Sequence, residues 1–342
     1  MIKLSVLDQS PVSEGTSPAE ALAQTAILAR EAERLGYHRF WVSEHHSAAG
    51  LAGSSPEVLM AHLAAVTTTI RIGSGGVLLP HYSAYKVAEN FRVLEALYPR
   101  RIDLGVGRAP GGAALVTRAL QEQHQLRSSD HYEQQVEDLI TYLYNKVDPA
   151  HRFAGLTATP AIATAPEIWL LGSSKDSAAL SAKLGTGFAF AQFINGAGGS
   201  EAVKAYQHRF QPSPVTQNPR SLVAVFAVCA ETSEQADQLA SSMDLSLVLL
   251  EKGHVSTGTP SVEKAQSYPY TPYDMFRIQD NRKRMVIGSP EDVRAQLEAL
   301  AEQYQCEEVM IASIMYSFAD KLKSLQLIAE VCGLQQRSTT SL

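Results

Sequence analysis

Short apolar runs alternate along the chain with longer segments that carry helix signals. Each apolar run has the length and composition of a strand buried in a parallel sheet. Eight such runs are predicted, at residues 2–7, 39–42, 70–73, 102–106, 168–171, 187–191, 222–229 and 309–313. The alternation of strands with helices predicts an α/β fold in which right-handed crossovers connect parallel strands.

Helix starts are marked by short capping patterns. Ser17-Pro18-Ala19-Glu20 offers an N-cap, a proline at the first helical position and a glutamate at the third, and Gly36 stands where the helix should end. Segments 55–57, 232–235 and 289–292 repeat this start signal. The eight strands are therefore separated by helices, as a crossover fold requires.

Eight strand–helix units favour a single (β/α)8 TIM barrel, with an open doubly wound sheet as the alternative. The barrel domain is expected to span 1–334, followed by a polar tail at 335–342. Residues 121–127 form a long, Gln-rich connection. Residues 253–284 are polar, contain three prolines and show no clear periodicity. This long insertion after strand 7 is expected to be a flexible flap.

Composition narrows the class of protein. Of 342 residues, 45% are hydrophobic and 19% charged, which excludes a disordered chain. The net charge of −6, without a clustered basic stripe, argues against nucleic-acid binding. The three cysteines show no C-x-x-C spacing, and neither a membrane span nor a signal peptide is seen. A soluble cytoplasmic protein, with no membrane partner, is expected.

Three ionisable side chains follow strand 2, in the run Ser43-Glu44-His45-His46. Catalytic groups of a barrel lie at the C-terminal ends of the strands. One inward-facing histidine there suits acid–base work near neutral pH, and the alternative is a structural histidine bonded to backbone. His45 and His46 point to opposite faces if the strand continues, and no close ligand set supports a metal site.

Glycine-rich segments follow three other strands. Gly75-Gly76 permits either a tight turn or the close approach of a flat ligand. Arg108, among glycines after strand 4, is a candidate anion clamp, although the glycine spacing there is one residue too long for a dinucleotide fingerprint. Ser173, Ser174 and Ser177 open a helix after strand 5, where they either cap the helix or bind phosphate.

These loops together resemble the bacterial-luciferase-like flavin monooxygenases, which are (β/α)8 barrels. The resemblance runs from residue 2 to about 331, and its most specific segments are 41–46, 72–80, 88–89 with 102–112, 172–185 and 286–291. It departs at Gly172, where luciferase has an acidic residue, and near Phe193, where luciferase has a tryptophan.

The resemblance implies roles for particular residues. His45 matches the catalytic histidine, and Arg108 matches the arginine that binds the FMN phosphate. Gly75 and Gly76 match a dipeptide that forms a non-prolyl cis peptide under the flavin. The further expected residues are Ser173, Ser174, Ser177 and Phe193 at the cofactor and Gln9, Glu44 and His81 at the substrate.

The implied activity is that of a two-component enzyme. A separate NAD(P)H-dependent flavin reductase would supply reduced FMN, and reaction with O2 would give a C4a-peroxyflavin that oxygenates a small organic substrate, with long-chain aldehydes as one class. A homodimer paired through 55–67 and 83–97 is also implied. Two alternatives stay open, namely a deazaflavin (F420)-dependent dehydrogenase and a non-catalytic flavin-binding protein.

Overall fold

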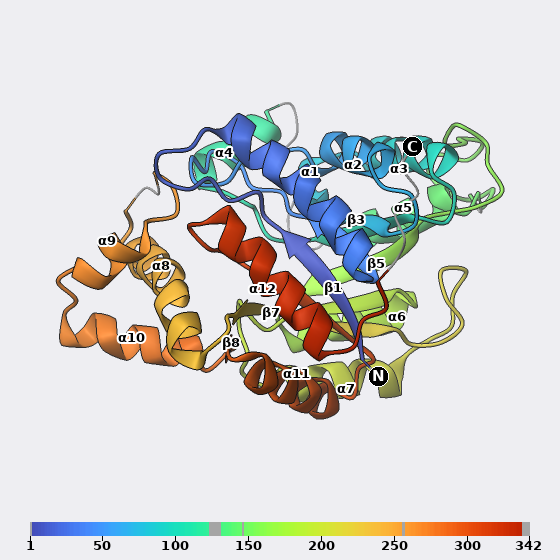
Figure 1. The fold of residues 1–342 in the computed structure, drawn as a ribbon. Coiled ribbons are helices and arrows are strands. Elements are labelled where there is room, and N and C mark those ends of the chain that lie inside the picture. The colour runs from blue at the N-terminus through green and yellow to red at the C-terminus, as the bar shows by residue number, and fades with distance from the viewer. Residues whose placement is uncertain (1, 123–130, 146, 255–256, 337–342) are drawn as a thin grey trace.

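The computed structural model describes residues 2–122, 131–145, 147–254 and 257–336, which form a barrel of parallel strands surrounded by helices (Figure 1). The strands are β1 Lys3–Asp8, β2 Arg39–Val42, β3 Arg71–Leu78, β4 Ile102–Gly107, β5 Glu167–Gly172, β6 Gly187–Ala191, β7 Ser221–Cys229, β8 Met285–Gly288 and β9 Glu308–Ala312. From β1 to β7 they follow one another in chain order, and β9 closes the ring between β7 and β1.

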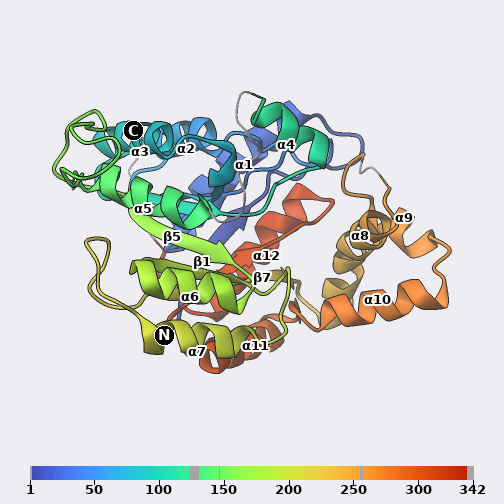
Figure 2. The ribbon, with the colours of Figure 1, turned by 180° about the vertical axis from the view of Figure 1, so that it is seen from behind.

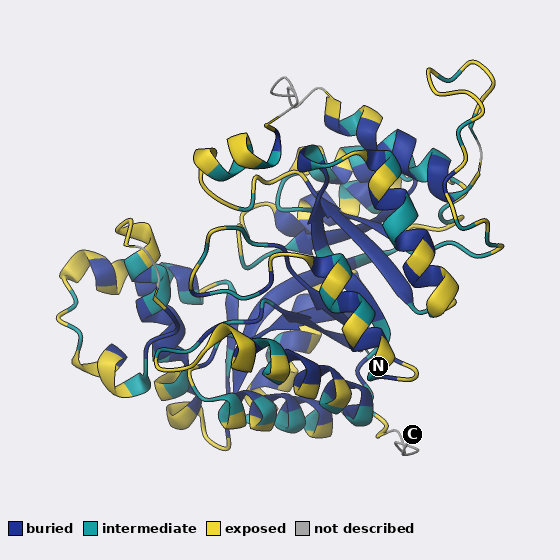
Figure 3. Ribbon diagram, turned by 90° about the horizontal axis from the view of Figure 1, so that it is seen from above, coloured by how far each residue is buried: buried dark blue, intermediate teal, exposed yellow. Residues whose placement is uncertain are grey.

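Helices connect these strands and form the outer layer. They are α1 Pro18–Leu35, α2 Pro56–Ala65, α3 Ala84–Leu97, α4 Ala114–Leu120, α5 His131–Leu143, α6 Lys175–Leu184, α7 Gly199–Arg209, α8 Ser233–Glu251, α9 Val262–Ser267, α10 Pro272–Arg282, α11 Pro290–Tyr304 and α12 Phe318–Val331, with a 3-10 turn η1 at Leu79–His81. The strands are buried, while the helices expose their outward faces (Figure 3).

The predicted barrel is confirmed, and the structure adds to it in two places. The strand β8 was not predicted; it pairs with residues 226–229 of β7, whereas β9 pairs with residues 222–226. The third strand is longer than predicted, because β3 continues through its glycines to Leu78. Gly75 and Gly76 therefore lie within the strand, at a bulge in the pairing with β4, rather than in a loop after it.

Local capping chemistry explains where the helices begin. Ser17 accepts a hydrogen bond from the Glu20 N–H, and Glu20 accepts one from the Ser17 N–H, so the predicted capping box is present at α1. Thr232 caps α8 by accepting from the Gln235 N–H, and Ser289 caps α11 by accepting from the Asp292 N–H. Ser55 differs, since α2 begins at Pro56 without a side-chain cap. These bonds satisfy N–H groups that a helix leaves free at its start.

An ion-pair cluster closes the barrel at the N-terminal ends of its strands. Arg39 donates to Asp103 at 2.7 Å and to Glu308 at 2.7 Å, and Arg71 donates to Asp103 at 2.5 Å. Burial alone would raise the pKa of Asp103, but the two guanidiniums hold that pKa below its usual value. Trp41 Nε1 adds a bond of 2.9 Å to the same carboxylate. The charged groups at this end of the barrel are thus paired with one another, as buried charges must be.

The insertion at 253–284 contains two helices that its sequence pattern did not predict. Its role as a flexible flap stays a prediction. The helices α9 and α10 pack with α8 as a group at one side of the barrel (Figures 1 and 2). Arg277 donates to Glu251 at 2.8 Å and Arg282 to Asp244 at 2.5 Å, which ties α10 to α8. The overlooked signal was Thr271-Pro272, a cap followed by an N-terminal proline.

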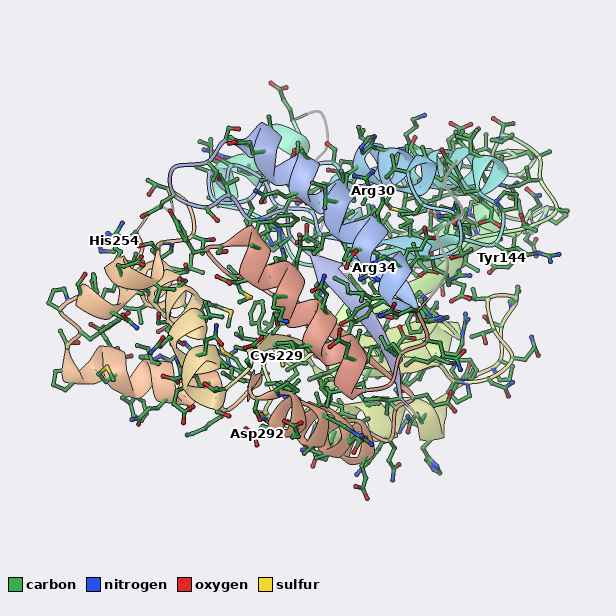
Figure 4. The ribbon with its side chains drawn as sticks, in the orientation of Figure 1. Arg30, Arg34, Tyr144, Cys229, His254 and Asp292 are labelled. Carbon is green, nitrogen blue, oxygen red and sulfur yellow. The ribbon has the colours of Figure 1, made fainter. Side chains whose placement is uncertain are left out.

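The three cysteines, Cys229, Cys306 and Cys332, are free thiols, and Cys229 is labelled in Figure 4. Burial raises the pKa of the Cys229 thiol to about 12 and the pKa of the other two to about 11. Such thiols stay protonated near neutral pH and are poor nucleophiles. Most of the Gln-rich connection at 121–127 and of the tail at 335–342 lies outside the described residues.

Candidate active site

A cavity of about 540 Å³ opens at the C-terminal ends of the barrel strands. Its size is within the range of small-molecule and cofactor sites, roughly 300–1,000 Å³. Its lining comes from the ends of β1 to β7 and from β9. The predicted residues that line it are Gln9, Glu44, His45, Gly75, Gly76, Arg108, Ser173, Ser174, Ser177 and Phe193. The fold thus gathers residues that are dispersed over most of the sequence.

His45 lies in the loop after β2, because that strand ends at Val42. The loop is held by the His45 N–H, which donates to the Gly53 carbonyl at 2.9 Å. The His45 Nδ1 lies 3.0 Å from the Ser43 hydroxyl. Burial, and then the neighbouring charge of His46, lower the pKa of His45 below its ordinary value. Both effects favour the neutral form of the ring.

Glu44 lines the cavity, but its carboxylate accepts three hydrogen bonds from other groups of the protein. It accepts hydrogen bonds from His46 Nε2 at 2.7 Å, from the Tyr82 hydroxyl at 2.6 Å and from the Leu78 N–H at 3.0 Å. These bonds connect the end of β2 to the end of β3 and to η1. We infer that Glu44 fixes the cavity wall, and that His46, unlike His45, works with it in this structural role.

The peptide bond between Gly75 and Gly76 is cis, as the resemblance implied. A Cβ atom at Gly75 would lie 2.7 Å from Leu7 Cδ1, and one at Gly76 would lie 2.6 Å from the Gly105 carbonyl oxygen. Neither position has space for a side chain. Only glycine leaves this part of the cavity surface smooth enough for a flat ring system to lie on the backbone.

Arg108 follows β4 directly and is exposed at the rim of the cavity. Within the described part of the chain, no hydrogen bond or ion pair engages its guanidinium. The α6 N-terminus opens onto the same cavity through Ser173, Ser174 and Ser177. Ser174 caps α6 by accepting from the Ser177 N–H at 3.3 Å. Ordinary capping therefore accounts for Ser174, while the α6 dipole and Arg108 together suit an anion.

One part of the cavity wall is apolar. Phe193 packs against Phe226 with ring centroids 4.9 Å apart, and Ile194 lines the cavity beside it. The main-chain carbonyls of both residues accept hydrogen bonds from Arg284, which precedes β8. By contrast, Phe188 and Phe190 are fully buried and do not line the cavity.

His81 is the predicted site residue that does not reach the cavity. It is buried in η1, where its Nε2 lies 2.9 Å from the Pro110 carbonyl and its Nδ1 lies 3.3 Å from Gln121 Nε2. Both ring nitrogens therefore have protein partners. The bond to Pro110 connects η1 to the loop after β4, and a contact of His81 with substrate stays a prediction.

Several lining residues were not predicted from the sequence. They include Leu7, Trp41, Ser43, Leu171, Ala189, Ala191, Ile194, Ala224 and Met310. A usable signal was the small residues at alternate positions of β6, Ala189 and Ala191, which share the inner face. The other apolar residues carry no such signal, because strands of a parallel barrel are apolar on both faces.

Among the residues that the structure describes, no group of three or more His, Cys, Asp or Glu side chains is arranged to hold a metal ion. Across the same ranges, no helix has both the length and the apolar character needed to cross a membrane.

The sequence was compared with known proteins. Residues 2–305 match the family model described as luciferase-like monooxygenase. The chain is 54% identical to the uncharacterized protein YwcH of Bacillus subtilis strain 168, over 96% of this chain and 99% of that protein. It is 40% identical to the N-acetyl-S-alkylcysteine monooxygenase of the same strain, over 96% of this chain and 98% of the relative.

Solved structures share the fold. Apo-MsnO8 superposes with a TM-score of 0.91 at 40% identity, covering 98% of this chain and 100% of that chain. The oxygenating constituent of 3,6-diketocamphane monooxygenase from Pseudomonas putida, in complex with FMN, gives 0.69 at 19% identity over 97% and 98% of the two chains. An F420-dependent secondary alcohol dehydrogenase gives 0.67 at 12% identity over 97% and 99%. The last two likenesses concern the fold alone.

Proposed function

The chain belongs to the luciferase-like monooxygenase family, and from this premise we propose that it is a flavin-dependent monooxygenase. It uses reduced FMN and O2 to oxygenate a small organic substrate. One observation carries the proposal: a single cavity brings together a histidine with a lowered pKa, a side-chain-free glycine surface and an arginine that has no hydrogen-bond or ion-pair partner among the described residues, beside a helix N-terminus.

The residues fit the parts of FMN. Gly75 and Gly76 have no side chain and so leave a flat backbone surface for the isoalloxazine ring. Only glycine fits at these positions, because any Cβ there would collide with neighbouring atoms of the protein. Arg108 and the first turn of α6 provide the charge and the N–H groups that a phosphate dianion requires. When bound, the reduced flavin would supply the oxygen chemistry, which protein side chains cannot perform alone.

The remaining residues would orient and protect the reaction. His45 would exchange hydrogen bonds or a proton with the reacting groups through Nε2. The apolar wall of Phe193, Ile194 and Met310 would exclude water and contact the body of an uncharged substrate. Gln9, which also lines the cavity, would contribute a polar contact to that substrate. We therefore propose a substrate with an apolar body and few charges.

Two substrate classes are worth testing against this wall. Long-chain aldehydes are one class that the luciferase resemblance implies. The name of the relative at 40% identity points to thioethers of the N-acetyl-S-alkylcysteine type. Both would offer an alkyl group that could contact Phe193 and Ile194.

Partners and location are part of the proposal. Reduced FMN would come from a separate NAD(P)H-dependent flavin reductase, and the protein would work in the cytoplasm. A homodimer through α2 and α3 is supported by the exposure of Val58, Val93 and Leu97 on these helices. Light scattering at micromolar concentration should give the mass of a dimer, and the mass of a monomer would contradict this part.

The central experiment is an anaerobic titration of the protein with reduced FMN, followed by admission of air in the presence of each substrate class. We expect saturable binding and an oxygenated product. A parallel titration with reduced F420 distinguishes the dehydrogenase alternative, in which hydride transfer needs no O2. Binding of FMN with no product from any substrate would instead favour a non-catalytic flavin-binding protein.

Paired histidine variants make the test specific. His45→Ala should retain FMN affinity within severalfold while product formation falls by about 10²–10⁴-fold. His46→Ala should mainly lower stability, by about 1–3 kcal/mol, because the buried Glu44 carboxylate loses a donor. Wild-type turnover by His45→Ala would overturn the catalytic assignment.

A further inference from the structure

The loop that carries His45 is fixed on both sides of the ring. The Ser43 N–H donates to the Asp8 carbonyl at 3.3 Å, and the His45 N–H donates to Gly53 at 2.9 Å. The next residue, His46, donates from its N–H to the Gly111 carbonyl at 3.0 Å. With its backbone held in this way, the His45 side chain has little freedom beyond rotation about its own bonds.

Ser43 faces that side chain. Its side chain is buried, with the residue 3% exposed, and its hydroxyl lies 3.0 Å from His45 Nδ1. No other hydrogen bond of this hydroxyl is found in residues 2–122, 131–145, 147–254 and 257–336. A buried hydroxyl normally donates its hydrogen to an acceptor. The His45 Nδ1 lone pair is the acceptor within reach.

The acceptor role of Nδ1 decides the state of the ring. A neutral imidazole carries one hydrogen, on one nitrogen or on the other. If Nδ1 accepts from Ser43, the hydrogen must be on Nε2. The Nε2 atom has no hydrogen-bond partner among the described residues. It is also not one of the side-chain nitrogen and oxygen atoms that are fully buried without a partner. It is therefore the ring nitrogen that is open to the cavity.

We propose that Ser43 is a positioning residue that holds His45 in the tautomer with hydrogen on Nε2, so that His45 presents a hydrogen-bond donor to the ligand in the cavity. This inference rests on the proposed function for the identity of that ligand, a reduced flavin with its substrate. Its structural basis is independent of the ligand. A donor at this position stabilises an electronegative atom of the ligand, whereas the opposite tautomer would repel it.

The adjacent histidine provides an internal contrast. His46 directs its Nε2 to the Glu44 carboxylate at 2.7 Å and is thereby removed from the cavity chemistry. The two neighbouring histidines thus differ in their hydrogen-bond partners. The His45 ring lies beside a serine hydroxyl, and the His46 ring lies beside a carboxylate. Ser43 selects the ring that stays available.

Nuclear magnetic resonance can test the proposal on the cofactor-free protein. Histidine side chains labelled with ¹⁵N are observed at a pH well above ~6.5, where imidazoles are neutral. The signals of His45 are assigned by their loss in His45→Asn. We expect a single tautomer with hydrogen on Nε2. A wild-type ring with hydrogen on Nδ1 would overturn the proposal without any variant of Ser43.

Three serine variants complete the design. Ser43→Ala should release the ring into a mixture of both tautomers, and Ser43→Thr, which keeps the hydroxyl, should restore the single form. Ser313→Ala is the matched control, because Ser313 is buried and its hydroxyl donates to the Ala227 carbonyl at 2.7 Å, away from any histidine. An unchanged tautomer in Ser43→Ala would also refute the proposal.

Turnover and binding separate this inference from the proposed function. In Ser43→Ala, product formation with reduced FMN should fall by about 10–100-fold, less than after loss of the imidazole itself, with FMN affinity within about threefold. Ser43→Thr should recover most of the rate. If the wild-type protein neither binds reduced FMN nor forms product, the proposed function fails, and the NMR result still decides the role of Ser43.

Discussion

The guanidinium of Arg284 donates a hydrogen bond of 3.0 Å to the main-chain carbonyl of Phe193, 91 residues earlier in the chain. The same group bonds the carbonyl of Ile194 and the side chain of Asn281 on α10. The insertion between β7 and β8 is thereby connected to the apolar wall of the cavity. A change at one end of this connection should therefore be detectable at the other.

Arg284→Met should loosen the cavity wall. The variant keeps much of the apolar volume of the side chain but leaves two carbonyls without their donor, so residues 192–196 should lose protection against hydrogen exchange. Arg277→Met is the matched control, since Arg277 bonds Glu251 on α8 and does not contact the wall. Equal protection of 192–196 in the wild type and Arg284→Met would contradict the connection.

Arg108→Ala should weaken FMN selectively. Hydrogen bonds to a charged phosphate contribute about 1.5–3 kcal/mol, so the Kd for FMN should rise about 10–100-fold, while riboflavin, which has no phosphate, should change little. Titration calorimetry of both ligands measures the difference. Arg118→Ala, an equal change of charge on the exposed face of α4, should leave both affinities unaltered. An equal loss for both ligands would place the phosphate elsewhere.

Acid should destabilise the folded protein in part through His45. Its folded-state pKa is lowered, first by burial and then by His46, so the unfolded chain binds this proton more readily. The stabilising contribution is present above the unfolded value of ~6.5 and is lost as the pH falls through the folded value. Thermal unfolding scans across this range should show a smaller loss for His45→Asn than for the wild type.

Two other histidines serve as comparisons for that measurement. His38 also has its pKa lowered by burial, so His45→Asn should reduce the acid sensitivity without abolishing it. His208→Asn, at an exposed position of α7, should follow the wild-type curve. Identical pH profiles for the wild type and His45→Asn would show that the ring is not held in its neutral form by the fold.

Arg39→Met should destabilise the barrel strongly. Asp103 and Glu308 would remain buried without their shared guanidinium, and breaking a buried pair in this way costs about 3–5 kcal/mol. Arg34→Met removes a half-exposed partner of Glu31 on α1, labelled in Figure 4, and should cost about 0–1 kcal/mol. Urea unfolding compares the two free energies. If the free energy of unfolding fell by less than about 1 kcal/mol in Arg39→Met, the ion-pair cluster around Arg39 would not have the stabilising role proposed here.

Local patterns in the sequence were sufficient to predict the class of fold and the end of the barrel at which the cavity lies. Apolar runs and capping boxes are local signals, because a strand or a helix start depends on residues within a few positions. Their alternation predicted the barrel, and the barrel placed His45, Arg108 and Ser173 at one end. The capping pattern of Ser17 and Glu20 was correct to the atom for the same local reason.

The hydrogen-bond partners of the polar groups, by contrast, depend on how distant parts of the chain pack together. Glu44 and His81 look like site residues in the sequence, yet their hydrogen bonds go to Tyr82 and to Pro110. Arg284 carries no local sign of its contact with Phe193. A local pattern fixes the backbone state of a residue, whereas the partner of a buried polar group is set by whichever distant donor or acceptor the packed chain brings within about 3 Å.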